Sequence, residues 1–166
     1  DKDADPQKGM DIAFNGKTRR YGVCNATETL LVHKDFDAKA LLKLIILLTE
    51  KGVEIRGCEK SQQLSSKISK AYDSDWTEEY LAPILSMKIV NSVDEAIKHI
   101  NTFGSAHTDA IVTENDEHSE KFLSEVDYEQ LSTLQKKQIC KLKAVNKVME
   151  KGKFTIDAGK TYNLSD

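Results

Sequence analysis

Between residues 6 and 126, segments with helix-like and strand-like apolar spacing follow one another in turn. Apolar residues that recur every three to four positions predict amphipathic helices, whereas short apolar and β-branched runs predict strands. This alternation is typical of an α/β fold, a mainly parallel sheet with helices on both faces. Ligand sites in such sheets lie beyond the carboxyl ends of the strands. We predict helices at 6–17, 38–51, 61–72, 93–103 and 117–126, and strands at 29–33, 53–56, 84–90 and 109–113.

Residues that favour helix ends mark several of these boundaries. The candidate N-caps are Asp5 before Pro6, Asp35 or Asp37, and Ser92, which has Glu95 three residues later as in a capping box. Gly52 is expected to end the second helix, 38–51. That helix is apolar nearly all round, so we expect it to pack on more than one side.

Composition limits the classes of partner. The chain has 166 residues, 39% of them hydrophobic and 31% charged, which is typical of a globular domain with a core. A net charge of −3 does not favour nucleic acid or a membrane surface, and no apolar run approaches the ~20 residues of a membrane span. The cysteines at 24, 58 and 140 lack C-x-x-C spacing, which indicates a reducing, cytoplasmic setting. No grouping of His, Cys and carboxylates has metal-ligand spacing.

Cys24 is the first candidate for chemistry. It lies in a short polar turn ahead of the strand 29–33, with the cations Lys17, Arg19 and Arg20 just upstream. Positive charge favours the thiolate, which is the nucleophilic form. The alternative is an inert structural thiol. The cations either bind a phosphate or carboxylate, or form a solvated helix end that complements the helix dipole.

The amino-acid sequence of this stretch resembles that of a known enzyme family. Val23-Cys24-Asn25-Ala26-Thr27-Glu28-Thr29-Leu30-Leu31-Val32-His33 resembles the active-site segment of γ-glutamyl phosphate reductase (glutamate-5-semialdehyde dehydrogenase), a branch of the aldehyde dehydrogenase superfamily. Five other segments are similar to this family in the same order: 1–5, 52–57, 75–81, 91–97 and 103–111. The resemblance covers residues 1 to about 127 and implies the catalytic domain of that enzyme.

The resemblance implies roles for six residues. Cys24 would attack L-glutamyl 5-phosphate to form a thioacyl-enzyme, and N–H groups at Cys24 and Asn25 would hold the oxyanion. Glu79 would accept hydrogen bonds from the nicotinamide ribose of NADP, although Leu81 stands where the superfamily usually has Phe; the alternative is a loop carboxylate. The implied substrate-binding residues are Arg20, His107 and Asp109.

The other histidines and cysteines have simpler interpretations. His107 can equally cap a turn. His33 ends a strand and is interpreted as structural, while His99 and His118 are expected on solvated helix exteriors. Cys58 has no neighbours in the sequence that suggest chemistry.

Residues 128–166 match no part of the family pattern. They hold eight Lys against four acidic residues, and Leu131, Leu134, Leu142, Val145 and Met149 can share one helical stripe. We therefore predict two parts, a catalytic-type domain (1–127) and a basic helical tail (128–166), with a short strand at 154–156.

In the resembled family, a nucleotide-binding domain precedes the position of residue 1. Because this sequence starts at Asp1 without Met, we expect a fragment of such an enzyme, or of a bifunctional enzyme fused to glutamate 5-kinase, that is inactive alone. The alternative is a truncated, inactive remnant that serves as an interaction or oligomerisation module. A homo-oligomer is possible in either case.

Overall fold

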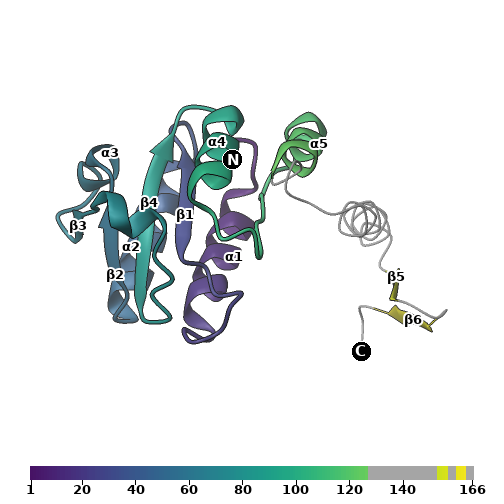
Figure 1. The fold of residues 1–166 in the computed structure, drawn as a ribbon, viewed down its shortest axis with the longest axis horizontal. Helices are drawn as coiled ribbons and strands as arrows, with labels where there is room; N and C mark the ends of the chain where they lie inside the picture. Colours follow the sequence, from purple (N-terminus) through teal and green to yellow (C-terminus); the bar gives the residue numbers. More distant parts are fainter. Residues whose placement is uncertain (127–152, 157–159, 164–166) are drawn as a thin grey trace. The chain divides into compact units, whose positions relative to one another are not determined.

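The computed structural model describes residues 1–126 and two short strands, 153–156 and 160–163. Residues 1–126 form one unit and 127–166 another. The elements of the first unit, drawn in Figure 1, follow in the order α1 (Pro6–Thr18), β1 (Thr29–His33), α2 (Ala38–Glu50), β2 (Glu54–Gly57), α3 (Glu59–Gln62), β3 (Ile68–Lys70), a 3-10 turn (Asp73–Trp76), β4 (Ile84–Val90), α4 (Val93–Phe103) and α5 (Asp116–Glu125).

The four strands form one parallel sheet in the order β1-β4-β2-β3. Side chains alternate between its faces, so Leu85, Met87 and Ile89 of β4 enter a core that also holds Met10 of α1 and Leu44 of α2. The intervening residues of β4 face the other way, toward the loop that precedes β4 and toward α4. The predicted α/β class is confirmed.

The sequence correctly places most helix starts because the caps are local. Asp5 accepts a hydrogen bond from the N–H of Lys8 at 2.7 Å, and Asp37 accepts one from Ala40 at 2.7 Å. Ser92 accepts the N–H of Glu95 at 3.2 Å. Gly52, with φ of +84°, follows α2 in the left-handed conformation that glycine tolerates best.

Two structural predictions are wrong. The segment 61–72 is not one helix: α3 ends at Gln62, and β3 begins at Ile68, where its backbone pairs with Ile55 of β2. The segment 109–113 is not a strand and has no helix or strand assignment. The helix α2 contacts both α1 and β2, as expected, while Leu42 and Ile46 on its outer face are 41% and 47% exposed.

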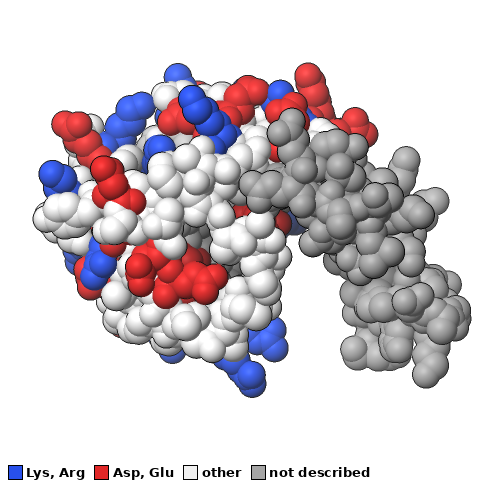
Figure 2. All heavy atoms as spheres, viewed as in Figure 1, with Lys and Arg blue, Asp and Glu red and all other residues white. Residues whose placement is uncertain are grey.

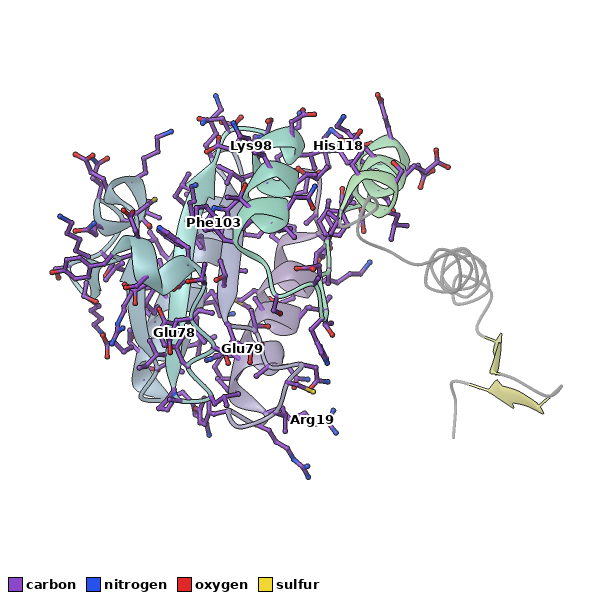
Figure 3. All side chains as sticks on the ribbon, viewed as in Figure 1. Arg19, Glu78, Glu79, Lys98, Phe103 and His118 are labelled. Atoms are coloured by element: carbon purple, nitrogen blue, oxygen red, sulfur yellow. The ribbon has the colours of Figure 1, made fainter. Side chains whose placement is uncertain are left out.

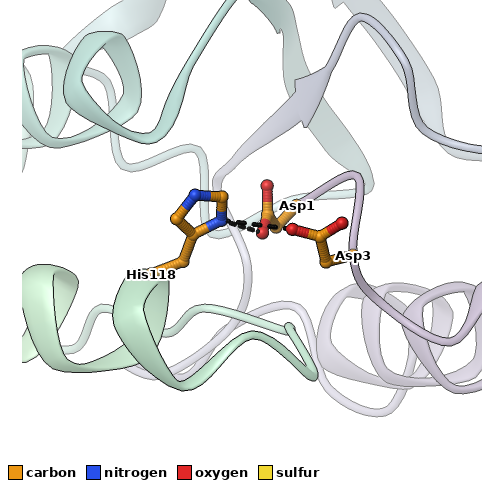
Figure 4. A group of neighbouring side chains, drawn as sticks. All are labelled: Asp1, Asp3 and His118. Atoms are coloured by element: carbon orange, nitrogen blue, oxygen red, sulfur yellow. Dashed lines mark hydrogen bonds and ion pairs between the residues drawn. The ribbon is translucent and has the colours of Figure 1, made fainter.

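A second, smaller core lies between α4 and α5. Val93, Ile97, Phe122 and Val126 form it. The start of the chain is tied to this region, as the side chains in Figure 4 show. Asp1 lies 2.6 Å from Nδ1 of His118, which is 3.5 Å from Asp3. His118 is thus part-buried in an ion-pair cluster, so the expectation of a solvated exterior is wrong for it.

The second unit contributes β5 (Lys153–Ile156) and β6 (Lys160–Asn163), which pair in an antiparallel manner. The strand predicted at 154–156 falls within β5. The predicted helical stripe from Leu131 to Met149 lies outside the described residues. In the described part of the chain, no helix has both the length and the apolar character needed to span a bilayer.

Candidate functional site

Cys24 lies in an exposed turn between α1 and β1. The turn is closed by a hydrogen bond from the N–H of Ala26 to the carbonyl of Val23 at 3.0 Å. The side chain of Cys24 is exposed and carries no disulfide. The thiol is therefore open to a reagent from solvent and is not part of the core.

A cavity of about 390 Å³ opens beside this turn. Four of the residues predicted for the site line it: Cys24, Asn25, Glu79 and Asp109. The turn of Cys24 precedes β1 and the loop of Glu79 precedes β4, so these two candidates lie near the amino ends of parallel strands. The expectation of a site at the carboxyl ends is wrong for them.

Arg20 and His107 are not among the residues that line the cavity. Both side chains are exposed. His107 Nδ1 lies 2.8 Å from Oγ1 of its neighbour Thr108. Figure 3 shows that Arg19, next to Arg20, points outward at the end of α1. The substrate roles of Arg20 and His107 stay predictions that this geometry does not support.

Lys17 is placed quite differently from the other two cations of this stretch. Its side chain is fully buried, and its ammonium lies 2.8 Å from the carboxylate of Glu28. It is neither a phosphate ligand nor part of a solvated helix end. The buried pair joins α1 to the residue that immediately precedes β1.

The loop that carries Glu78 and Glu79 is anchored on the sheet by Asp75. The Asp75 carboxylate is nearly buried and accepts hydrogen bonds from Arg56 (2.8 Å), Tyr80 (2.8 Å) and the N–H of Tyr72 (2.7 Å). Burial opposes ionisation, but the bonds from Tyr72, Arg56 and Tyr80 hold the pKa of Asp75 below its ordinary value. Burial and the nearby Asp75 carboxylate raise the pKa of Tyr80 to about 12.

His99 corrects the expectation of a solvated helix exterior. It is 5% exposed, and its ring makes an edge contact with Trp76 (5.3 Å between centroids) and a tilted contact with Phe103 (4.7 Å). Nδ1 lies 3.1 Å from the Lys88 ammonium, which can only donate, so the imidazole accepts. Burial, reinforced by the charge of Lys88, lowers the pKa of His99 to about 4. Its Nε2 has no hydrogen-bond partner among the described residues.

Cys58 lies away from this cavity, at the start of α3. Its sulfur is 3.2 Å from Oγ of Ser61 and accepts the N–H of Ile89 at 3.4 Å. Burial acts to raise the pKa of the thiol, but these hydrogen bonds outweigh it and lower the pKa. His33 is nearly buried at the end of β1, as expected for a structural residue.

The charge around the cavity is acidic. Among the described residues that line it are Glu28, Glu78, Glu79 and Asp109, but no Lys or Arg. Figure 2 shows acidic side chains gathered on one face of the domain, and Figure 3 places Glu78 and Glu79 on the loop beside the sheet. This part of the chain therefore offers carboxylates, but no lysine or arginine side chain, to a molecule in the cavity.

Sequence reasoning missed the residues that support the site. Asp75 and Arg56 are far apart in the sequence and meet only because β2 and β4 pair. Glu28 stands within the Cys24 motif, but no role is predicted for it there. The glycine before Lys17 is a weak sequence signal of close packing. An added Cβ at Gly16 would lie 2.6 Å from Oγ1 of Thr27, where α1 and the Cys24 turn are closely packed.

The fold is that of an aldehyde dehydrogenase-type protein. A propionaldehyde dehydrogenase from *Clostridium phytofermentans* shares it, with a TM-score of 0.53 and 18% identity over 75% of this chain and 37% of that one. No protein-family model matches the sequence.

Over about three quarters of its length, the chain is similar to gamma-glutamyl phosphate reductases. It is 58% identical to the reductase of Ruthia magnifica over 127 residues. This alignment covers 76% of this chain and 30% of the relative. The crystal structure of the *Thermotoga maritima* reductase matches with a TM-score of 0.73 and 41% identity, over 76% of this chain and 30% of that one. The chain thus spans less than a third of the length of these relatives.

Proposed function

We propose that this chain carries the nucleophilic half of a gamma-glutamyl phosphate reductase of the cytoplasm, an enzyme that makes glutamate-5-semialdehyde for proline synthesis. The observation that supports this most is the exposed thiol of Cys24 beside a cavity that Glu79 also lines. A reachable thiol next to an open cavity is what an acyl-transfer step requires.

In this proposal, the Cys24 thiolate attacks the acyl carbon of L-glutamyl 5-phosphate. The new C–S bond forms as the C–O bond to phosphate breaks, and inorganic phosphate leaves with the electron pair of that bond. The N–H groups of Cys24 and Asn25 stabilise the oxyanion during the attack. The product is a thioester on Cys24, which accepts hydride more readily than an oxygen ester does.

The residues present fit only one edge of an NADP molecule. The carboxylate of Glu79 suits the ribose hydroxyls. No lysine or arginine among the described residues lines the cavity to meet the cofactor phosphates. When bound, NADPH supplies the hydride that converts the thioester to the aldehyde. We infer that the remaining part of the enzyme holds most of the cofactor, so the isolated chain carries out acylation but not turnover.

The test is acyl transfer to the purified chain. Incubation with acetyl phosphate, a simple acyl phosphate, should add one acyl group, sensitive to hydroxylamine, on the peptide that contains Cys24. Cys24→Ser should abolish this adduct, and Cys58→Ser should keep it, because Cys58 lies away from the cavity. Acylation of Cys58 alone, or none at all, would contradict the proposal. It would favour the second candidate, an inactive interaction or oligomerisation module.

A further inference from the structure

One side chain, Glu28, contacts both parts of the candidate site. Its Oε2 accepts a hydrogen bond from the buried Lys17 ammonium at 2.8 Å. Its Oε1 accepts one from the N–H of Leu81 at 3.3 Å. Glu28 ends the turn that carries Cys24, and Leu81 follows the loop residue Glu79. The carboxylate therefore links the nucleophile turn to the loop proposed to meet the cofactor.

The position of Glu28 is fixed from several sides. A fully buried ammonium needs a nearby negative charge, which the Glu28 carboxylate supplies to Lys17. The carbonyl of Glu28 accepts the N–H of Ser86 in β4 at 2.9 Å. The preceding Thr27 donates its N–H to the carbonyl of Gly16 at 3.1 Å. Glu28 is thus bound to both α1 and the sheet, which makes it a rigid point of attachment.

The loop that carries Glu79 needs such a point of attachment. Leu81 has a φ of +48°, a left-handed conformation that is unfavourable for a residue with a branched side chain. Tyr80, just before it, is fixed to Asp75 and to Oγ of Ser86 at 2.8 Å each. The hydrogen bond from the N–H of Leu81 to Glu28 fixes the loop one residue beyond Tyr80.

We propose that Glu28 is a positioning residue that fixes the Cys24 turn relative to the loop of Glu79. The inference rests on the proposed function, in which an acyl group on Cys24 must face the cofactor edge near Glu79. If the acyl group were misoriented, the reaction would be slower although the thiol stayed accessible.

The first test measures geometry alone. The chain has one tryptophan, Trp76, at the start of this loop, and a fluorescent acceptor can be attached to Cys24 in a Cys58→Ser, Cys140→Ser background. Two variants remove the charged pair: Lys17→Met with Glu28→Gln keeps an acceptor for the N–H of Leu81, and Lys17→Met with Glu28→Met does not. Replacing both partners by neutral side chains of similar volume leaves no unpaired buried charge.

Time-resolved energy transfer from Trp76 should give a narrow distance distribution for the parent background and for the Gln variant, and a broad one for the Met variant. Equal widths for the two variants would overturn the role of Glu28. This outcome does not depend on whether Cys24 is a nucleophile, so failure of the inference is distinguishable from failure of the proposed function.

The second test measures chemistry, with Cys24 unlabelled. Acylation of Cys24 by acetyl phosphate should be about tenfold slower in the Met variant than in the Gln variant, because the turn that presents the Cys24 and Asn25 N–H groups to the oxyanion is then less well fixed. Its alkylation by iodoacetamide should differ by less than about twofold, because exposure of the thiol is unchanged. A parallel fall in both rates would mean a general loss of structure and would overturn the positioning role.

Discussion

The guanidinium of Arg56 on β2 lies 2.8 Å from the nearly buried carboxylate of Asp75, nineteen residues further along the chain. Arg56 pairs in register with Ser86 of β4, whose hydroxyl donates to the carbonyl of Asp75 at 2.9 Å. The loop that carries Glu79 is therefore attached to the middle of the sheet. Its position depends on strand pairing and not on the loop sequence alone.

Asp75→Asn should destabilise the domain by about 3 kcal/mol, because it removes one partner of a nearly buried ion pair. Urea unfolding followed by the fluorescence of Trp76 measures this change. Asp11→Asn is the control, since Asp11 is exposed on α1 and, among the described residues, bonds to Gln7 alone. A loss for Asp75→Asn no larger than for the control would contradict the assigned role of the pair.

The same carboxyl predicts a dependence of stability on acid. The folded-state pKa of Asp75 is lowered, so its stabilising contribution is present above the ordinary carboxyl pKa and is lost as the pH falls through the folded value. Urea midpoints measured from pH 5 downward should fall less steeply in Asp75→Asn than in the parent chain. Identical slopes would count against this assignment.

His99 should give a separate dependence of stability on pH, at higher pH than that of Asp75. Because its folded pKa is about 4, against 6.5 for the free side chain, the unfolded chain takes up the proton first. Stability should therefore fall by about 1–3 kcal/mol as the pH drops from 6.5 to 4. His99→Gln should remove most of this slope, whereas exposed His107→Gln should keep it. A slope that survives in His99→Gln would show that another group is responsible.

Gly57→Ala should cost about 2 kcal/mol because the added Cβ would lie 2.5 Å from Cγ2 of Ile68 and 2.6 Å from Oγ of Ser61. Gly22→Ala is the matched control, with no atom within 4 Å of the new Cβ, and should change stability by less than about 0.5 kcal/mol. Thermal unfolding of both variants tests the packing of β2 against β3 and α3. Equal melting temperatures would contradict it.

Local signals explain which parts of the fold were predictable. The N-caps Asp5, Asp37 and Ser92 each bind an N–H three residues ahead, so a short window of sequence contains the whole interaction. The strand at Ile68 depends on Ile55, which is remote in the sequence, and this pairing overrides the helical periodicity of 61–72. The segment 109–113 is strand-like in composition, yet the described sheet contains no strand there.

The site was predictable only where a motif marked it. Cys24, Asn25, Glu79 and Asp109 were selected by resemblance, and all four line one cavity. The residues that support the site were not predicted, since a lysine or histidine in a polar sequence is expected to be exposed to solvent. Lys17 and His99 are buried because Glu28, Trp76 and Lys88 come to them from other elements.

The central claim, that Cys24 accepts an acyl group from an acyl phosphate, is tested most directly by phosphate release. Mixing the purified chain with excess acetyl phosphate should release a burst of about one inorganic phosphate per chain, without NADPH. The burst should persist in Cys58→Ser and disappear in Cys24→Ser. A chain that releases no phosphate above the uncatalysed rate, or a burst that survives in Cys24→Ser, would contradict the account.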